Sequence, residues 1–160
     1  MHELRDMIAL HPQVQGSTND TLIECVEQCF ACAQTCIACA DACLAEPMVM
    51  QLQQCIRFNL DCADVCLAAG TLGIRRTASN ESMIIMLMEA CAAACGDCAE
   101  ECEKHADEHE HCRLCAEMCR ECEQSCTEAA RSIREAEIAK LLPLEQYPVF
   151  WPETPAPDYP

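Results

Sequence analysis

The cysteines of this chain recur at alternating intervals of four and three residues, and this spacing constrains the fold more than any other feature. Three blocks keep the interval without a break: Cys25, Cys29, Cys32, Cys36, Cys39 and Cys43; Cys91, Cys95, Cys98 and Cys102; and Cys112, Cys115, Cys119, Cys122 and Cys126. Residues three and four apart lie on one face of an α-helix, at the positions that leucine and isoleucine fill in a helix bundle. Each block therefore predicts one helix whose inward face is lined by thiols.

A fourth, shorter series consists of Cys55, Cys62 and Cys66, and Asn59 occupies the slot that would complete its spacing. Together the four series use all 18 cysteines of the 160-residue chain. Four inward thiol faces predict a bundle whose lumen is lined by sulfur along most of its length. Buried cysteine can also act only as a small apolar core residue, but leucine and isoleucine bury more apolar surface and would pack a bundle better.

The remaining sequence favours four long helices and no sheet. They are predicted to run from near Thr21 to Ala45, from Pro47 to Gly70 and Gly73, from the end of the polar 77–80 stretch to about Lys104, and from near Asp107 to a point before Pro143. Thr21 and Glu24 suit a capping box, and Pro47 suits the first turn of a helix. Short links favour antiparallel neighbours, so we expect an all-α, antiparallel up-down-up-down four-helix bundle with a cysteine-lined core.

The chain divides into three parts by composition. An N-terminal lead covers residues 1–19, the bundle covers residues 20–141, and a tail rich in proline and aromatic residues covers residues 142–160. The tail could extend as a polyproline-like segment, or its rings could dock on the bundle or on a second subunit. The links around Pro47 and Ala106 are expected at one end of the bundle, with the remaining link at the other end.

Charge and composition exclude several classes of function. The formal net charge is -17, from 27 acidic and 10 basic residues, so the chain lacks the basic surface that binds nucleic acid. The 4 glycines leave no Gly-rich phosphate loop. We expect neither a secretory signal nor a membrane span of roughly 18 to 20 apolar residues, which places the chain in the cytoplasm with reduced thiols. No nucleophile, base and orienting group stand out beside the cysteines, so no enzyme is predicted.

Reduced thiols in this pattern favour metal binding over disulfides. Thiolate selects soft or borderline ions, so Cu(I), Zn(II) and iron–sulfur clusters are the candidates. Cysteines four apart on one helix can place their sulfurs at about twice a metal–sulfur bond of about 2.3 Å, which suits a two-coordinate Cu(I) link. One Cu⁺ in place of each thiol proton leaves the lumen's charge unchanged, whereas four thiolates around Zn²⁺ leave two buried negative charges. We therefore predict many Cu(I) ions per chain.

Two other functions remain open at this point. A zinc or mixed-metal thiolate buffer would need discrete tetrahedral sets of four cysteines. A thiol redox protein would need a few accessible cysteines of low pKa, whereas these cysteines are predicted to face inward.

Three sequence blocks resemble the bacterial copper storage proteins, in particular their cytosolic type: CVEQCFACAQTCIACADAC, CAAACGDCAEEC and HCRLCAEMCRECEQSC. The resemblance runs from about Thr21 to Ile133. It implies a four-helix bundle that stores many Cu(I) ions in its core, a homotetramer, and a histidine-containing mouth where copper enters. It also favours Asn59 as a weak amide-oxygen ligand. The tail from Pro143 onward lies outside the resemblance.

Two histidines and a methionine are expected to bind Cu(I) at that mouth. His105 continues the register of the third cysteine series, His109 lies three residues before the fourth series, and Met48 lies seven residues before the second. Imidazole and thioether bind Cu(I) more weakly than thiolate, which suits capture and release. His111 is out of register, and the sequence assigns it to a polar turn. A copper chaperone could exchange the ion here, but the sequence does not identify one.

Three more methionines, Met83, Met86 and Met88, are predicted near the opposite end of the bundle. Only Met88 is in register with Cys91. Because methionine commonly fills gaps in cores, we expect core packing here rather than a second copper port.

Overall fold

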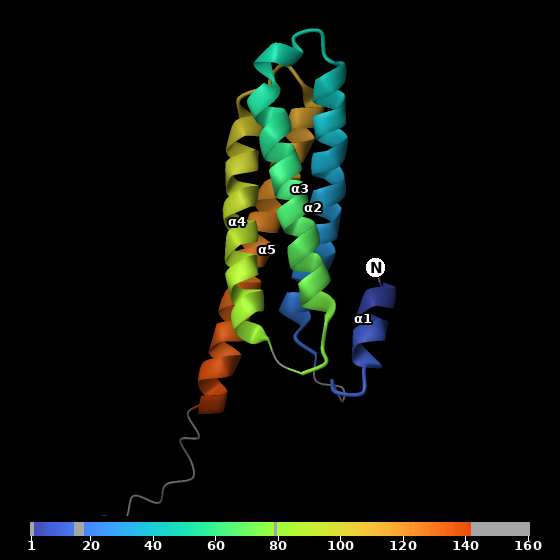
Figure 1. Cartoon of the computed structure of the whole chain (residues 1–160), viewed down its shortest axis with the longest axis vertical. Coiled ribbons are helices and arrows are strands. Elements are labelled where there is room, and N and C mark those ends of the chain that lie inside the picture. Colours follow the sequence, from blue (N-terminus) through green and yellow to red (C-terminus); the bar gives the residue numbers. More distant parts are fainter. Residues whose placement is uncertain (1, 15–17, 79, 142–160) are drawn as a thin grey trace, which may run out of the picture.

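A computed structural model describes residues 2–14, 18–78 and 80–141, and all the regular structure in those ranges is helical. Four long helices form the bundle (Figure 1): α2 (Asp20–Ala45), α3 (Gln53–Ile74), α4 (Glu81–Glu103) and α5 (Glu110–Leu141). A short helix α1 (His2–Ala9) precedes them, and a 3₁₀ turn η1 (Val49–Gln51) lies between α2 and α3. Both α2 and α4 pack against α3 and α5. The predicted all-α, up-down-up-down bundle is therefore confirmed.

The two ends of the bundle differ, as the link lengths predicted (Figure 1). The α2–α3 and α4–α5 links lie together at one end, which we call the histidine end and define by residues 46–52 and 104–109. The α3–α4 link, residues 75–80, lies at the other end beside α1, and we call this the distal end. The predicted tail, residues 142–160, lies outside the described residues.

The start of α2 differs from its prediction. Asn19 is the N-cap, because its Oδ1 accepts a hydrogen bond from the backbone N–H of Leu22 at 3.0 Å. The capping box expected from Thr21 and Glu24 is wrong, since both residues already lie inside the helix. An asparagine N-cap satisfies one of the free N–H groups of the first turn equally well.

The start of α3 is also different, because Pro47 does not lie in its first turn. Glu46, the residue before Pro47, has extended backbone (φ −72°, ψ 142°) and ends α2. Steric contact with the proline ring favours this conformation in the preceding residue. The chain then forms η1 and begins α3 only at Gln53, with Leu52 buried beneath the link.

Two glycines that were predicted to end the second helix lie inside it instead, and α3 continues to Ile74. A Cβ atom at Gly73 would lie 2.5 Å from Val26 Cγ2 and 3.2 Å from Met88 Cε. A Cβ atom at Gly70 would lie 3.0 Å from the ring of Phe30. These glycines therefore let the C-terminal part of α3 approach α2 closely.

Every cysteine lies in the core, and none is more than 3% exposed. At the distal end the thiol core gives way to apolar side chains, among them Leu22, Val26, Ile84 and Ile133. By length and composition α2 and α4 could each cross a membrane, although no membrane span was expected from the sequence. Their cysteine faces are buried against the neighbouring helices, so packing in the bundle accounts for this apolar character.

Candidate metal centre

Neighbouring thiols lie 3.5 to 4.0 Å apart along the lumen, and most of these contacts join different helices. Cys32 on α2 is typical: its Sγ lies 3.9 Å from Cys36 on the same helix, 3.7 Å from Cys119 on α5 and 4.0 Å from Cys95 on α4. The expectation of links within one helix thus describes only a minor part of the network. Because the bundle is narrow, sulfurs from facing helices meet as closely as those four residues apart.

These spacings suit ions that share sulfurs. With a metal–sulfur bond of about 2.3 Å, a linear link needs sulfurs about 4.6 Å apart, whereas a trigonal site needs them about 4 Å apart. The observed separations of 3.5 to 4.0 Å are nearer the trigonal value. Three-coordinate sites that share thiolates are therefore the arrangement that requires the least movement of side chains.

Groups of four thiols follow one another along the lumen and overlap. In each group the sulfurs lie within 4.8 Å of one another. The groups are Cys29, Cys91, Cys122 and Cys126; Cys32, Cys66, Cys95 and Cys122; Cys32, Cys36, Cys62 and Cys119; and Cys36, Cys98, Cys115 and Cys119. Successive groups share one or two members, so they cannot all be filled as separate tetrahedral sites. A series of monovalent ions bridged by shared thiolates requires such overlap, whereas discrete zinc sites would each need four cysteines of their own.

Asn59 lies fully buried among the thiols, in the slot that the cysteine spacing left open. Its Nδ2 donates a hydrogen bond to the backbone oxygen of Cys55 at 2.9 Å. Its Oδ1 accepts from the thiols of Cys115 at 2.9 Å and Cys98 at 3.5 Å. The amide oxygen therefore points into the lumen, where the resemblance expects a weak ligand.

His111 lies in the thiol network and not merely in a polar turn, which corrects the sequence interpretation. Its Nδ1 lies 3.4 Å from the Sγ of Cys112, 3.6 Å from Cys39 and 3.9 Å from Cys43. The opposite ring nitrogen, Nε2, donates a hydrogen bond to Glu46 Oε1 at 3.2 Å. Because the ionised carboxylate accepts a hydrogen bond from Nε2–H, the proton stays on Nε2 and the lone pair of Nδ1 faces the sulfurs, which is the tautomer that a metal ligand needs.

The other histidine-end residues contact carboxylates or solvent, and the side chains of His105 and His109 are 20% and 16% exposed, against 25% for His111. His109 Nδ1 is 3.2 Å from Glu46 Oε1, and its ring centroid is 5.3 Å from that of His111. His105 Nε2 is buried, forms no hydrogen bond among the described residues, and lies 3.5 Å from a carboxylate oxygen of Glu101. Met48 is 57% exposed. All three lie at the predicted end, and of these four residues His111 is the one whose hydrogen bonds with thiols are seen among the described residues.

Protonation differs along the network. Burial raises the pKa of the Cys43 thiol to about 12, with the neighbouring Cys55 adding to the effect. Hydrogen bonding with Cys126 lowers the pKa of Cys25 to about 5. At the histidine end, the hydrogen bond from His111 lowers the pKa of Glu46, which keeps this carboxylate ionised. A metal cation that enters the lumen must therefore displace protons from thiols such as Cys43.

A narrow four-helix bundle with a continuous sulfur network and an imidazole at one end defines a thiolate-based store for soft metal ions. The chain belongs to the copper storage protein family, whose model matches residues 18–131. A search of curated proteins found no match.

Solved structures of this family include close matches from Streptomyces lividans. The copper storage protein Ccsp, loaded with 10 copper equivalents, is 44% identical, with a TM-score of 0.77, and the match covers 80% of this chain and 98% of that one. A cytosolic copper storage protein with five coppers is 48% identical, with a TM-score of 0.69 over 70% of this chain and 93% of that one. A single-residue Ccsp variant, in which a histidine is replaced by alanine, is 46% identical, with a TM-score of 0.71 over 72% of this chain and 97% of that one.

Proposed function

We propose that this protein stores many Cu(I) ions in the cytosol, bound by the thiolates that line its lumen. The overlap of successive four-thiol groups carries this conclusion, because each shared thiolate can bridge two monovalent ions. The family supports it, as do similar structures described as cytosolic and as loaded with up to 10 copper equivalents. The role is storage rather than catalysis.

Anaerobic titration with Cu(I) in the presence of a chromophoric chelator tests the storage role. We expect the reduced chain to take at least about ten ions before the chelator competes, since bridging gives about one ion per thiolate. Saturation at about four or five Cu(I), together with tight binding of zinc in tetrahedral sites, would instead indicate a zinc or mixed-metal buffer.

Thiol labelling of the folded, metal-free protein tests the redox alternative. The burial of all the cysteines predicts slow and uniform labelling. One or two thiols that react much faster than the rest would favour a redox function.

Copper is proposed to enter and leave at the histidine end. His111 supports this role, because its Nδ1 faces three thiols while Glu46 fixes the opposite nitrogen. Met48 is 57% exposed and would meet the ion first, and His105 and His109 lie at the same end and would help to hand it on to His111. A neutral imidazole binds Cu(I) less tightly than a thiolate, so an ion captured there can move into the lumen.

Loading kinetics of single variants test this path. We expect His111→Ala to slow the uptake of the first Cu(I) more than His109→Ala does, with total capacity nearly unchanged in both. Glu46→Gln should have an intermediate effect, because the amide still bonds to Nε2 but no longer holds a charge beside it. His11→Ala at the distal end is the matched control and should load like the wild type. Equal rates in all four variants would contradict entry at the histidine end.

The expected homotetramer is also a proposal. Ile37 and Leu44 on α2, and Leu60 and Leu67 on α3, are between 39% and 59% exposed. The two residues of each pair are seven apart and so lie on one face of their helix. The two helices, α2 and α3, are neighbours in the bundle. Light scattering should give about four times the chain mass of 17.7 kDa. The double change Leu44→Glu and Leu67→Glu should dissociate the assembly, whereas Leu114→Glu on α5 should not.

A further inference from the structure

The sulfur network does not end at a cysteine. Met88 on α4 is fully buried, and its Sδ lies 3.5 Å from the Sγ of Cys25. Cys25 in turn lies 3.5 Å from Cys126. The thioether therefore extends the chain of sulfur contacts by one atom at the distal end, at the same spacing as the thiols.

Several features hold Met88 in this orientation. It precedes Cys91 by three residues and so continues the cysteine face of α4. A Cβ atom at Gly73 would lie 3.2 Å from Met88 Cε, so the glycine leaves room for the methyl group on the α3 side. Of the described methionines, only Met88 is fully buried; Met83 and Met86 on the same helix are 43% and 55% exposed. Core packing explains its burial, but packing alone does not require the sulfur to face a thiol.

Cys25 lies at the distal end of the thiol network. Its Sγ lies 3.5 Å from Met88 Sδ and 3.5 Å from Cys126 Sγ, and it also hydrogen-bonds with Cys29. The thioether is therefore as near to Cys25 as the thiol of Cys126 is, and it can complete a three-coordinate site with these two thiolates. A thioether supplies a third ligand that is soft and neutral, so it neither releases a proton nor adds charge to the lumen.

We propose that Cys25 Sγ, Cys126 Sγ and Met88 Sδ bind one Cu(I) ion, so that Met88 is a metal ligand at the distal end of the store. This inference rests on the proposed storage function. The Cu⁺ ion displaces one proton from the Cys25–Cys126 pair, so the local charge does not change. Cys126 also lies 3.6 Å from Cys29, so its thiolate is shared with the ion of the next site. Both sulfur separations from Cys25, to Met88 Sδ and to Cys126 Sγ, are 3.5 Å, so an increase of about half an ångström in each would match the roughly 4 Å spacing of a trigonal site.

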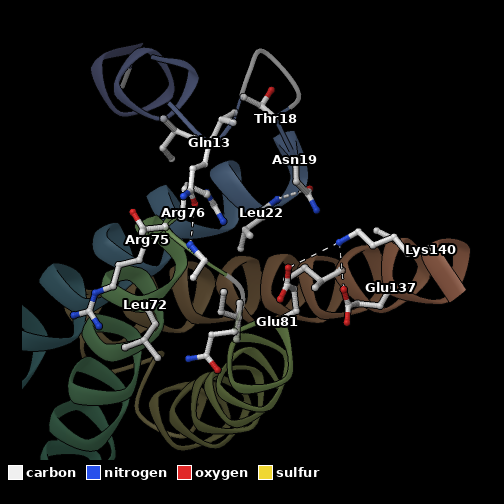
Figure 2. Close-up of a pocket in the computed structure, with 18 residues that line it drawn as sticks. Gln13, Thr18, Asn19, Leu22, Leu72, Arg75, Arg76, Glu81, Glu137 and Lys140 are labelled. Carbon is white, nitrogen blue, oxygen red and sulfur yellow. Dashed lines mark hydrogen bonds and ion pairs between the residues drawn. The ribbon is translucent and has the colours of Figure 1, made fainter. Parts of the chain in front are cut away.

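The distal site is closed to solvent on its outer side. A cavity of about 700 Å³ lies beyond it, between the N-terminal lead, the α3–α4 link and the end of α5 (Figure 2). Leu22, Ile84 and Ile133 form part of the cavity wall and also belong to the buried core that includes Met88. Among the described residues, no cysteine or methionine lines this cavity, and the buried side chains of Leu22, Ile84 and Ile133 stand in its wall. We therefore expect an ion to reach Met88 through the lumen from the histidine end.

Diffraction from crystals of the anaerobically loaded protein, measured at the copper absorption edge, tests the site directly. We expect an anomalous peak within bonding distance of Cys25 Sγ, Cys126 Sγ and Met88 Sδ. Copper throughout the rest of the lumen, with this position empty or with the thioether turned away, would overturn the inference but leave the storage function intact. A lumen without copper would overturn both.

A titration of two variants provides the second test. Leucine has nearly the volume of methionine, so Met88→Leu should keep the fold. At a chelator concentration that leaves the wild type full, Met88→Leu should retain one Cu(I) fewer per chain. Met86→Leu, two residues away on the exposed face, is the control and should retain the wild-type number. Equal retention by Met88→Leu and the wild type would show that the thioether is not a ligand.

Discussion

At the scale of single residues, Asn59 is the polar group whose loss should matter most to the metal-free fold. It joins the backbone of α3 to the thiols of Cys115 and Cys98 on α5 and α4. Asn59→Ala leaves these donors and acceptors unsatisfied in a buried site, which should destabilise the metal-free protein by about 1–3 kcal/mol. Urea unfolding under reductant measures this loss.

Asn80→Ala is the matched control for that prediction. Asn80 is exposed and caps α4 without a side-chain hydrogen bond, so its replacement should change the free energy of unfolding by less than about 0.5 kcal/mol. Equal effects of the two substitutions would mean that the buried amide contributes little to stability.

The cysteine faces could be predicted because a regular helix fixes their direction, but His111 could not. The register of the third cysteine series places His105 at the lumen and that of the fourth places His109 there, whereas His111, one residue before Cys112, falls outside that face. Residues 104–108 form turns between α4 and α5, so the lumen ends here and a side chain beside the cysteine face can reach its sulfurs. His111 then lies in the first turn of α5, immediately before Cys112, where its ring reaches across the end of the lumen. Two features of the sequence could have indicated this role of His111: the adjacent Cys112 and the acidic Glu46 before Pro47.

At the scale of helices, Gly73 sets how closely α3 and α2 approach. Gly73→Ala would place a Cβ 2.5 Å from Val26 Cγ2, and the backbone must shift to relieve the contact. We expect a loss of about 1–3 kcal/mol in the free energy of unfolding, the usual cost of overpacking a core. Thermal or urea unfolding of the metal-free protein measures it.

Gly96→Ala is the control, because it changes the same residue type inside another helix. Its Cβ would meet only the carboxylate end of Glu123, at 3.0 Å, and this side chain can move. The higher helix propensity of alanine should then stabilise α4 by up to about 1 kcal/mol. Destabilisation of similar size at both positions would exclude close packing as the reason for Gly73.

These glycines also show why helix ends were harder to predict than helix faces. Gly70 and Gly73 suggested the end of the second helix, since glycine commonly follows a helix. Whether a glycine ends a helix or permits close packing depends on the facing side chains, here Phe30 and Val26 on α2. That information is tertiary and not local. Pro47 was misplaced for a related reason, because it ends α2 through Glu46 and does not begin α3.

At the scale of the whole molecule, the lumen must hold many ionisable thiols away from water without a cation. Metal-free, it does so by keeping most of them protonated. The pKa of Cys43 is raised to about 12 by burial, and hydrogen bonding to Cys115 raises the pKa of Cys36. Cu⁺ then replaces protons one for one, so the net charge of the core stays the same while the store fills. The net negative charge of -17 therefore lies on the surface, and filling the lumen with Cu⁺ does not add to it.

The raised pKa values of buried thiols predict how the stability of the metal-free protein depends on pH. An unfolded cysteine ionises near pH 8.5, whereas a thiol such as Cys43 stays neutral in the fold up to about pH 12. A pKa raised by folding contributes stability that is fully present below the unfolded pKa and is lost as the pH rises towards the folded pKa. The urea midpoint of the metal-free protein should therefore fall steadily from about pH 8.5 to pH 11. The copper-loaded protein should show little change, because its thiols have already lost their protons to the metal. A metal-free midpoint that is constant over this range would mean that the lumen tolerates free thiolates and does not depend on protons or copper to neutralise them.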